Sequence, residues 1–187
     1  MIEPTLRMIA KLAINNALAN YRLAKAVARL SQAEFEAPRT GFFPSLKATL
    51  NHILVIDWFY IDALRGGALG PKAWENEMPF DTVDALYAAQ RTSDLDLVAF
   101  CKGLVPEALA APVAIHRQNR VQTERCDDVL SHLFAHQIHH RGQAHTLLAG
   151  TSVPPPQLDE FIVADDAGFR NQELAAFGWD ETMLQDV

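Results

Sequence analysis

Cysteine is scarce in this chain. Its 187 residues include two cysteines, Cys101 and Cys126, and no Cys-x-x-Cys pair. Neither a disulfide framework nor a thiolate zinc knuckle is therefore indicated. A chain with this cysteine content is expected in a reducing, cytoplasmic setting.

Excess basic charge and long apolar runs are lacking as well. The 16 Lys and Arg residues face 23 Asp and Glu residues, for a net charge of −7. Because nucleic-acid binding requires a basic stripe, we expect no nucleic-acid partner. No window approaches the ~20 apolar residues of a membrane span. Glu3, Arg7 and Lys11 interrupt the N-terminal stretch, so a signal peptide is not expected either. We expect a soluble protein without a membrane partner.

Two catalytic patterns are also missing. No Glu-x-x-His pair occurs in the sequence, which argues against a di-iron carboxylate bundle. No Ser-His-Asp or Cys-His spacing is recognisable, so a covalent nucleophile is not indicated and no catalytic residue is assigned.

Histidine, in contrast, is concentrated in one stretch. Residues 131–143 read SHLFAHQIHHRGQ and hold four of the seven histidines. His132, His136 and His140 follow one another at intervals of four, which places them on one face of a helix, with His139 at its edge. Two imidazoles one turn apart can share a metal ion, and burial keeps them neutral. The alternative is a polar core feature, since buried histidines are often only hydrogen-bonded.

Apolar periodicity predicts four long helices, over residues 4–30, 45–64, 81–102 and 127–149. Asp81 is the expected N-cap of the third. Residues 34–44 are expected to be a loop, and residues 105–122 a short hairpin or an extended crossover. The predicted fold is all-α, a four-helix bundle over residues 1–163. Residues 164–187 form a C-terminal extension that packs on the bundle or on a partner chain.

Polar residues interrupt the apolar faces of these helices. Asn16 and Asn20 lie on the inward stripe of the first helix, where bound water or the surroundings of a metal site would satisfy them. They are rim residues if the helix is rotated slightly. Asp57, on the second helix, faces water, bonds a neighbouring helix or orients a histidine. Arg141 is interpreted as a surface residue.

The motif HLFAHQIHHRGQ, together with TLNHILVIDWFYIDAL on the second helix, resembles the DinB/YfiT-like family of metal-dependent proteins. The similarity covers roughly residues 1–163. It implies that His52, His136 and His140 hold the metal. His132 would either replace one of these three ligands or contact a ligand without binding the metal itself. His139, Arg141 and Gln143 belong to the motif but are not carried over as ligands.

Three imidazoles leave a coordination position open, which is typical of catalytic sites. The resemblance therefore implies a divalent transition metal (zinc, nickel or iron) and an enzyme acting on a small molecule. The reaction is thiol S-transfer, using a low-molecular-weight thiol, or hydrolysis; a homodimer is expected. Two alternatives are a haem bundle with two axial histidines and a metal-binding or stress-response module without turnover.

Overall fold

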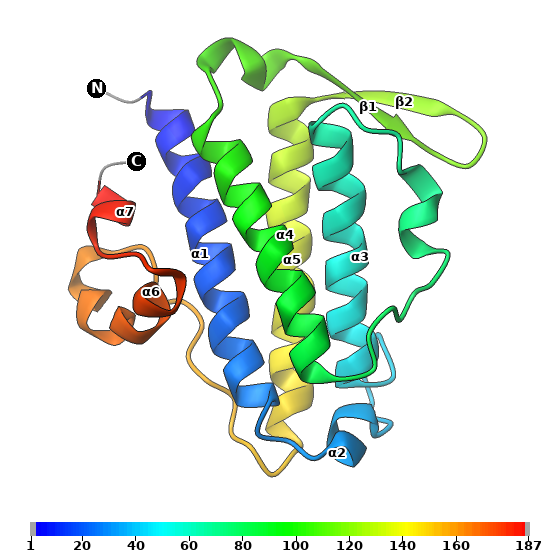
Figure 1. Cartoon of the computed structure of the whole chain (residues 1–187), viewed down its shortest axis with the longest axis vertical. Helices are drawn as coiled ribbons and strands as arrows, with labels where there is room; N and C mark the ends of the chain where they lie inside the picture. The colour runs from blue at the N-terminus through cyan, green and yellow to red at the C-terminus, as the bar shows by residue number, and fades with distance from the viewer. Residues whose placement is uncertain (1–2, 186–187) are drawn as a thin grey trace.

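Four long helices form the body of the molecule (Figure 1). The structure is a computed structural model that describes residues 3–185. The four helices are α1 (Pro4–Val27), α3 (Leu46–Leu64), α4 (Val83–Lys102) and α5 (Cys126–Ala149). The predicted four-helix bundle is therefore confirmed. None of the helices within the described range is long and apolar enough to cross a membrane.

The helices pack as a ring in which α1 and α3 are diagonally opposite. Each of these two contacts both α4 and α5. In Figure 1, α1 and α5 run in one direction and α3 and α4 in the other. Since α3 and α4 are parallel, the chain must return along the bundle between them. Residues 65–82 make this connection and include a short 3₁₀ helix, η1 (Gly70–Trp74).

The bundle interior is apolar at both ends. Large side chains with almost no exposure fill it, including Ile14, Phe59, Leu97 and Leu133. Burial of such side chains from every long helix is the main force that holds the bundle together. At mid-depth the interior is polar, because Asn16, Asp57 and Asp94 are buried there.

The ends of two elements differ from the sequence prediction. The first helix ends at Val27, and a one-turn helix, α2 (Gln32–Glu36), overlaps the start of the predicted loop. Ser31 and Glu34 form a capping box at its start. The N-cap of α4 is Thr82, whose side chain accepts from Ala85 N, whereas Asp81 was expected to be the cap. Asp81 binds Lys47 Nζ at 2.7 Å instead.

A β-hairpin closes one end of the bundle (Figure 1). Strand β1 (Pro112–His116) pairs antiparallel with β2 (Val121–Arg125). It follows the 3₁₀ helix η2 (Pro106–Ala110). Val113 and Ile115 are buried while their neighbours on β1 are not, so one face of the hairpin covers the core. Of the two predicted forms, the hairpin is correct, and its second strand continues directly into α5.

The C-terminal part of the chain packs on the outside of α1 (Figure 1). It contains the 3₁₀ helix η3 (Ala164–Phe169), α6 (Asn171–Phe177) and α7 (Thr182–Gln185). Leu174, Phe177 and Leu184 are buried there. Arg91 of α4 donates to Ala176 O at 3.0 Å. Up to residue 185, the extension packs on the bundle of its own chain.

Candidate metal centre

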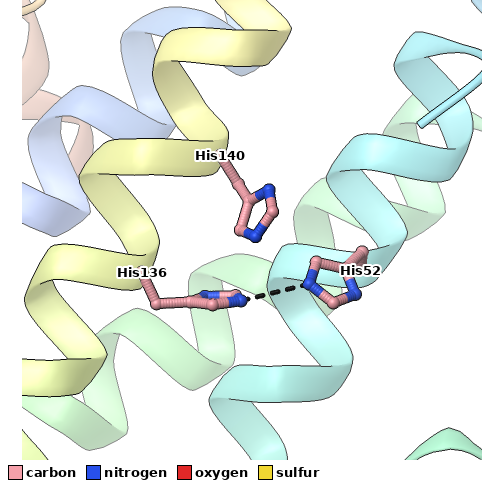
Figure 2. Close-up of side chains that lie close together, drawn as sticks. All are labelled: His52, His136 and His140. Carbon is pink, nitrogen blue, oxygen red and sulfur yellow. Dashed lines mark hydrogen bonds between the residues drawn. The ribbon is translucent and has the colours of Figure 1, made fainter. Parts of the chain in front are cut away.

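Three histidines from two neighbouring helices point toward one another (Figure 2). His52 comes from the middle of α3, and His136 and His140 come from successive turns of α5. The Nε2 atoms of His52 and His136 are 3.1 Å apart. One nitrogen from each of the three rings lies within 4.8 Å of the other two. The structure thus brings together the three residues that were predicted as ligands.

The spacing of these nitrogens suits a shared metal ion. Two imidazole nitrogens bound to one tetrahedral ion at ~2.0–2.1 Å lie about 3.3 Å apart. The 3.1 Å between His52 and His136 is close to this separation. Two facing nitrogen lone pairs repel each other, so a proton or a cation has to lie between them. The donor set therefore fits a cation.

Burial keeps the three imidazoles neutral near pH 7. Desolvation, with the charge of His140 as the second cause, lowers the pKa of His52 to about 4. Desolvation and the neighbouring histidines lower the pKa of His136 to about 3. Desolvation also lowers the pKa of His140. Because a metal binds only the neutral ring, the lowered pKa values leave all three histidines able to bind a metal near pH 7.

Gln143 sets the orientation of His140. Its Oε1 lies 2.8 Å from His140 Nδ1. An amide oxygen can only accept, so Nδ1 carries the proton and the Nε2 lone pair is left for a metal. The Gln143 amide in turn lies 3.0 Å from His139 Nε2, to which it donates. Sequence reasoning noted Gln143 as part of the motif but missed this role, although its position three residues after His140 is the signal for such a contact.

No comparable partner holds His136. Its Nδ1 is buried and accepts or donates no hydrogen bond within residues 3–185. The ring is positioned by packing, with centroid distances of 4.4 Å to His140 and 5.1 Å to His52.

Comparisons with known proteins identify the family and the fold of the chain. A model of the DinB family matches residues 1–173. The chain belongs to the DinB family. A crystal structure of a DinB-like protein from Bacillus cereus ATCC 10987 shares the fold, with a TM-score of 0.58 and 15% identity. That match covers 74% of this chain and 89% of the other. No curated protein matches the sequence significantly.

In this DinB protein, aromatic side chains cover one side of the histidine cluster. Phe43, in the loop before α3, lies 4.4 Å from His52 and 5.5 Å from His140 between ring centroids. Phe42 is 6.0 Å from His140 and is 75% exposed. The loop is held by Arg39, which donates to Gly150 O at 3.0 Å. Of the two rings, Phe43 therefore covers the cluster on that side.

The two further histidines of the motif are exposed. His132 lies 6.3 Å from His136 between ring centroids and packs on Tyr60 at 5.1 Å. It belongs to the surroundings of the cluster and not to the group of three. His139 is linked to the cluster through Gln143.

Asn16 and Asn20 make their hydrogen bonds in a separate network. They donate to Asp94 Oδ1 at 3.2 and 2.9 Å. Arg141 donates to their carbonyl oxygens at 2.6 and 2.9 Å. Both asparagines are buried, so they are not rim residues. No hydrogen bond joins either of them to a histidine of the cluster. The prediction that Arg141 is a surface residue is wrong, because it is 5% exposed and faces this network.

Asp57 belongs to the same network. Gln90 donates to Asp57 Oδ2 at 2.7 Å and to Asp94 Oδ1 at 3.1 Å, and Gln137 donates to Asp57 Oδ1. The carboxylate thus bonds neighbouring helices and orients no histidine directly. Burial raises the pKa of Asp57 to about 7. Burial and the charge of Asp57 raise the pKa of Asp94 to about 8. The polar mid-depth of the bundle is therefore filled by a hydrogen-bonded core.

Proposed function

We propose that this DinB protein is a metal-dependent enzyme whose divalent ion is held by His52, His136 and His140. The observation that carries the proposal is the pair of facing Nε2 atoms, 3.1 Å apart, with the third imidazole beside them. Three neutral nitrogen ligands leave a position open for a small molecule. When bound, such an ion supplies Lewis acidity, which lowers the pKa of a thiol or of water.

The side chains around the three histidines favour thiol S-transfer over hydrolysis. Metal-dependent hydrolases of the His-Glu-x-x-His type use a carboxylate as general base beside the ion. Within residues 3–185, the group of side chains that could hold the ion contains no carboxylate, and Glu77, which lines a cavity together with His52, is exposed to solvent. Asp57, the carboxylate considered from the sequence, is buried and bonded to Gln90 and Gln137. A thiol that the ion makes acidic needs no separate base, whereas amide hydrolysis also requires a proton donor.

The protein's own side chains then have three tasks. The imidazoles provide ligands that are neutral at pH 7 because burial lowers their pKa. Gln143 fixes the tautomer of His140. Phe43 covers the cluster and limits access of water.

Metal content of the purified protein, measured by elemental mass spectrometry, tests the proposal. We expect about one equivalent of metal in the parent and loss of most of it in His52→Ala and His140→Ala. His132→Ala is the matched control, since its exposed ring lies on the same helix and outside the group of three. Circular dichroism should show the same helix content in all four proteins.

Absence of metal from the reconstituted parent would refute the metal site. If the metal is present, thiol transfer to an electrophile should be lost with it in His140→Ala and kept in His132→Ala. A protein that binds the metal, yet transfers no thiol under any condition screened, would be a metal-binding module instead.

A further inference from the structure

Each histidine that α5 supplies to the cluster is followed along the chain by a residue of the buried hydrogen-bond network. Gln137 follows His136, and Arg141 follows His140. Successive residues of an α-helix point about 100° apart around its axis, so the two pairs form two parallel lines along α5. The histidine line faces His52 of α3 (Figure 2). The other line faces the interior of the bundle, where Gln137 and Arg141 are buried.

The residues of this second line bind the two helices that flank α5. Gln137 donates to Asp57 Oδ1 on α3. Arg141 donates to Asn16 Oδ1 at 2.6 Å and to Asn20 Oδ1 at 2.9 Å, both on α1. Since α1 and α3 are diagonally opposite in the bundle, these hydrogen bonds hold α5 from both sides. They therefore oppose rotation of α5 about its axis in either direction.

Small rotations of α5 matter to a metal centre. A side-chain atom about 7 Å from the helix axis moves by about 1 Å when the helix turns by about 8°. Metal–ligand distances have to stay within about 0.2 Å of their usual values. Apolar packing around α5 is non-directional, whereas a hydrogen bond weakens steeply when its angle falls. The hydrogen bonds of the network therefore specify the rotation of α5 more closely than the apolar core does.

We infer that Gln137 and Arg141 are positioning residues for the metal centre, because they fix the rotation of α5 at which His136 and His140 face His52. The effect passes through the backbone of α5. Within residues 3–185, neither side chain forms a hydrogen bond with a histidine of the cluster. The inference rests on the proposed function for the nature of the site, and it assigns a role there to two residues that bind no metal themselves.

Zinc affinity, measured by competition with a chelator of known affinity, tests this role. Gln137→Leu and Arg141→Met each remove one set of hydrogen bonds and should weaken zinc binding about 10- to 100-fold. Arg141→Lys keeps a donor for the asparagine oxygens on α1 and should keep most of the affinity. Asn16→Ala removes one of the two acceptors of Arg141 without changing α5. As the mildest variant, it should weaken zinc binding about 3-fold.

Leu133→Ala is the matched control. Leu133 is fully buried one turn before Gln137 on the same line of α5, and its side chain forms no hydrogen bond. The substitution should lower the free energy of unfolding, since it leaves a cavity in the core. It removes no directional contact, so the zinc affinity of the folded protein should stay close to that of the parent. A loss of zinc affinity in Leu133→Ala as large as in the two network variants would overturn the inference.

A double-mutant cycle separates loss of alignment from loss of stability. In the parent, His52→Ala removes a ligand and should weaken zinc binding strongly. In Gln137→Leu, where α5 no longer presents its histidines to α3, the same substitution should have an effect about 10-fold smaller. A destabilised but aligned site would show the same effect of His52→Ala in both backgrounds. That result would also overturn the inference.

The metal-free protein gives a readout that does not depend on the proposed function. The rings of His52 and His136, with centroids 5.1 Å apart, should show a nuclear Overhauser effect in the parent and in Leu133→Ala. Gln137→Leu and Arg141→Met should lose it. If the parent shows this pattern but binds no zinc, the positioning role holds and the proposed function fails. Unchanged zinc affinity in both network variants would remove the positioning role and leave the metal centre in place.

Discussion

The imidazole of His140 illustrates how a single neighbour defines the chemistry of a ring. An isolated imidazole exchanges its proton between two nitrogens, and only one tautomer leaves Nε2 free. Gln143 Oε1 removes this ambiguity by accepting from Nδ1 at 2.8 Å. His136 has no such partner at Nδ1, so its orientation depends on packing and on the 3.1 Å contact between its Nε2 and His52 Nε2. The contribution of the Gln143 contact can be measured directly.

We expect Gln143→Leu to weaken metal binding about 10- to 100-fold, which is the usual effect of losing the hydrogen-bond partner of a metal-binding histidine. Leucine keeps most of the volume and loses the acceptor for His140. Competition with a chelator of known affinity measures the change. His139→Ala is the control, because it removes only the hydrogen bond between Gln143 and His139 and leaves the bond between Gln143 and His140 in place. An equal loss in both variants would contradict the orienting role of the amide oxygen.

At the scale of the helices, the buried network joins all four long elements of the bundle. Asn16 and Asn20 come from α1, Asp57 from α3, Asp94 from α4, and Arg141 from α5. The network contains two carboxyls and one guanidinium, so full ionisation would leave an uncompensated negative charge in the core. Such a charge is costly, and retention of a proton avoids it.

This arrangement makes stability depend on pH through Asp94. The folded protein holds the proton with a pKa of about 8, compared with 3.8 for the ordinary carboxyl. The stabilising effect is therefore complete below pH 4 and is lost as the pH rises through 8. Over that range it changes by about 1.4 kcal/mol per pH unit for each proton.

In Asp94→Asn, the free energy of unfolding in urea should vary less between pH 5 and pH 8.5 than in the parent. The amide oxygen can still accept from Asn16, Asn20 and Gln90, and Asp94 Oδ2 has no partner within the described range that would be lost. Asp96→Asn, at a half-buried position on the same helix and outside the network, is the control. The idea fails if the parent and Asp94→Asn respond identically to pH.

At the scale of the whole molecule, one arginine ties the C-terminal segment to the bundle. Arg22 of α1 binds Glu160 at 2.6 Å and Glu173 at 2.9 Å. Its guanidinium also lies 4.4 Å from the ring centroid of Phe161, which is fully buried. Because these partners are partly buried, the contacts are worth more than those of a surface pair.

We expect Arg22→Met to loosen the segment without unfolding the bundle. Cleavage by a protease within residues 157–173 should become about 10-fold faster, since local opening then costs less free energy. Arg7→Met, at an exposed position on the same helix, should leave the rate unchanged. Metal content should be the same in all three proteins. Simultaneous loss of metal and helix content would show that the segment is part of the bundle's own folding unit.

Local patterns were sufficient for the helices and the histidines. Apolar periodicity identified the four long helices, because a helix buries residues three and four apart along its own chain. The interval of four placed His136 and His140 together. The same interval includes His132, which is exposed and lies outside the group of three. Periodicity cannot make this distinction, since it does not specify where His52 of the neighbouring helix meets the stripe.

The tertiary structure alone decided where the other polar side chains act. Asn16, Asp57 and Arg141 occupy a buried network whose partners are remote in sequence. Which of these residues meet depends on how each helix is rotated and on which helices are neighbours. The cavity beside His52 arises in the same way, because Trp74 and Glu77 reach it from a connection without periodicity. The sequence thus determined which helices form and which carry the histidines, and packing between helices determined the surroundings of those histidines.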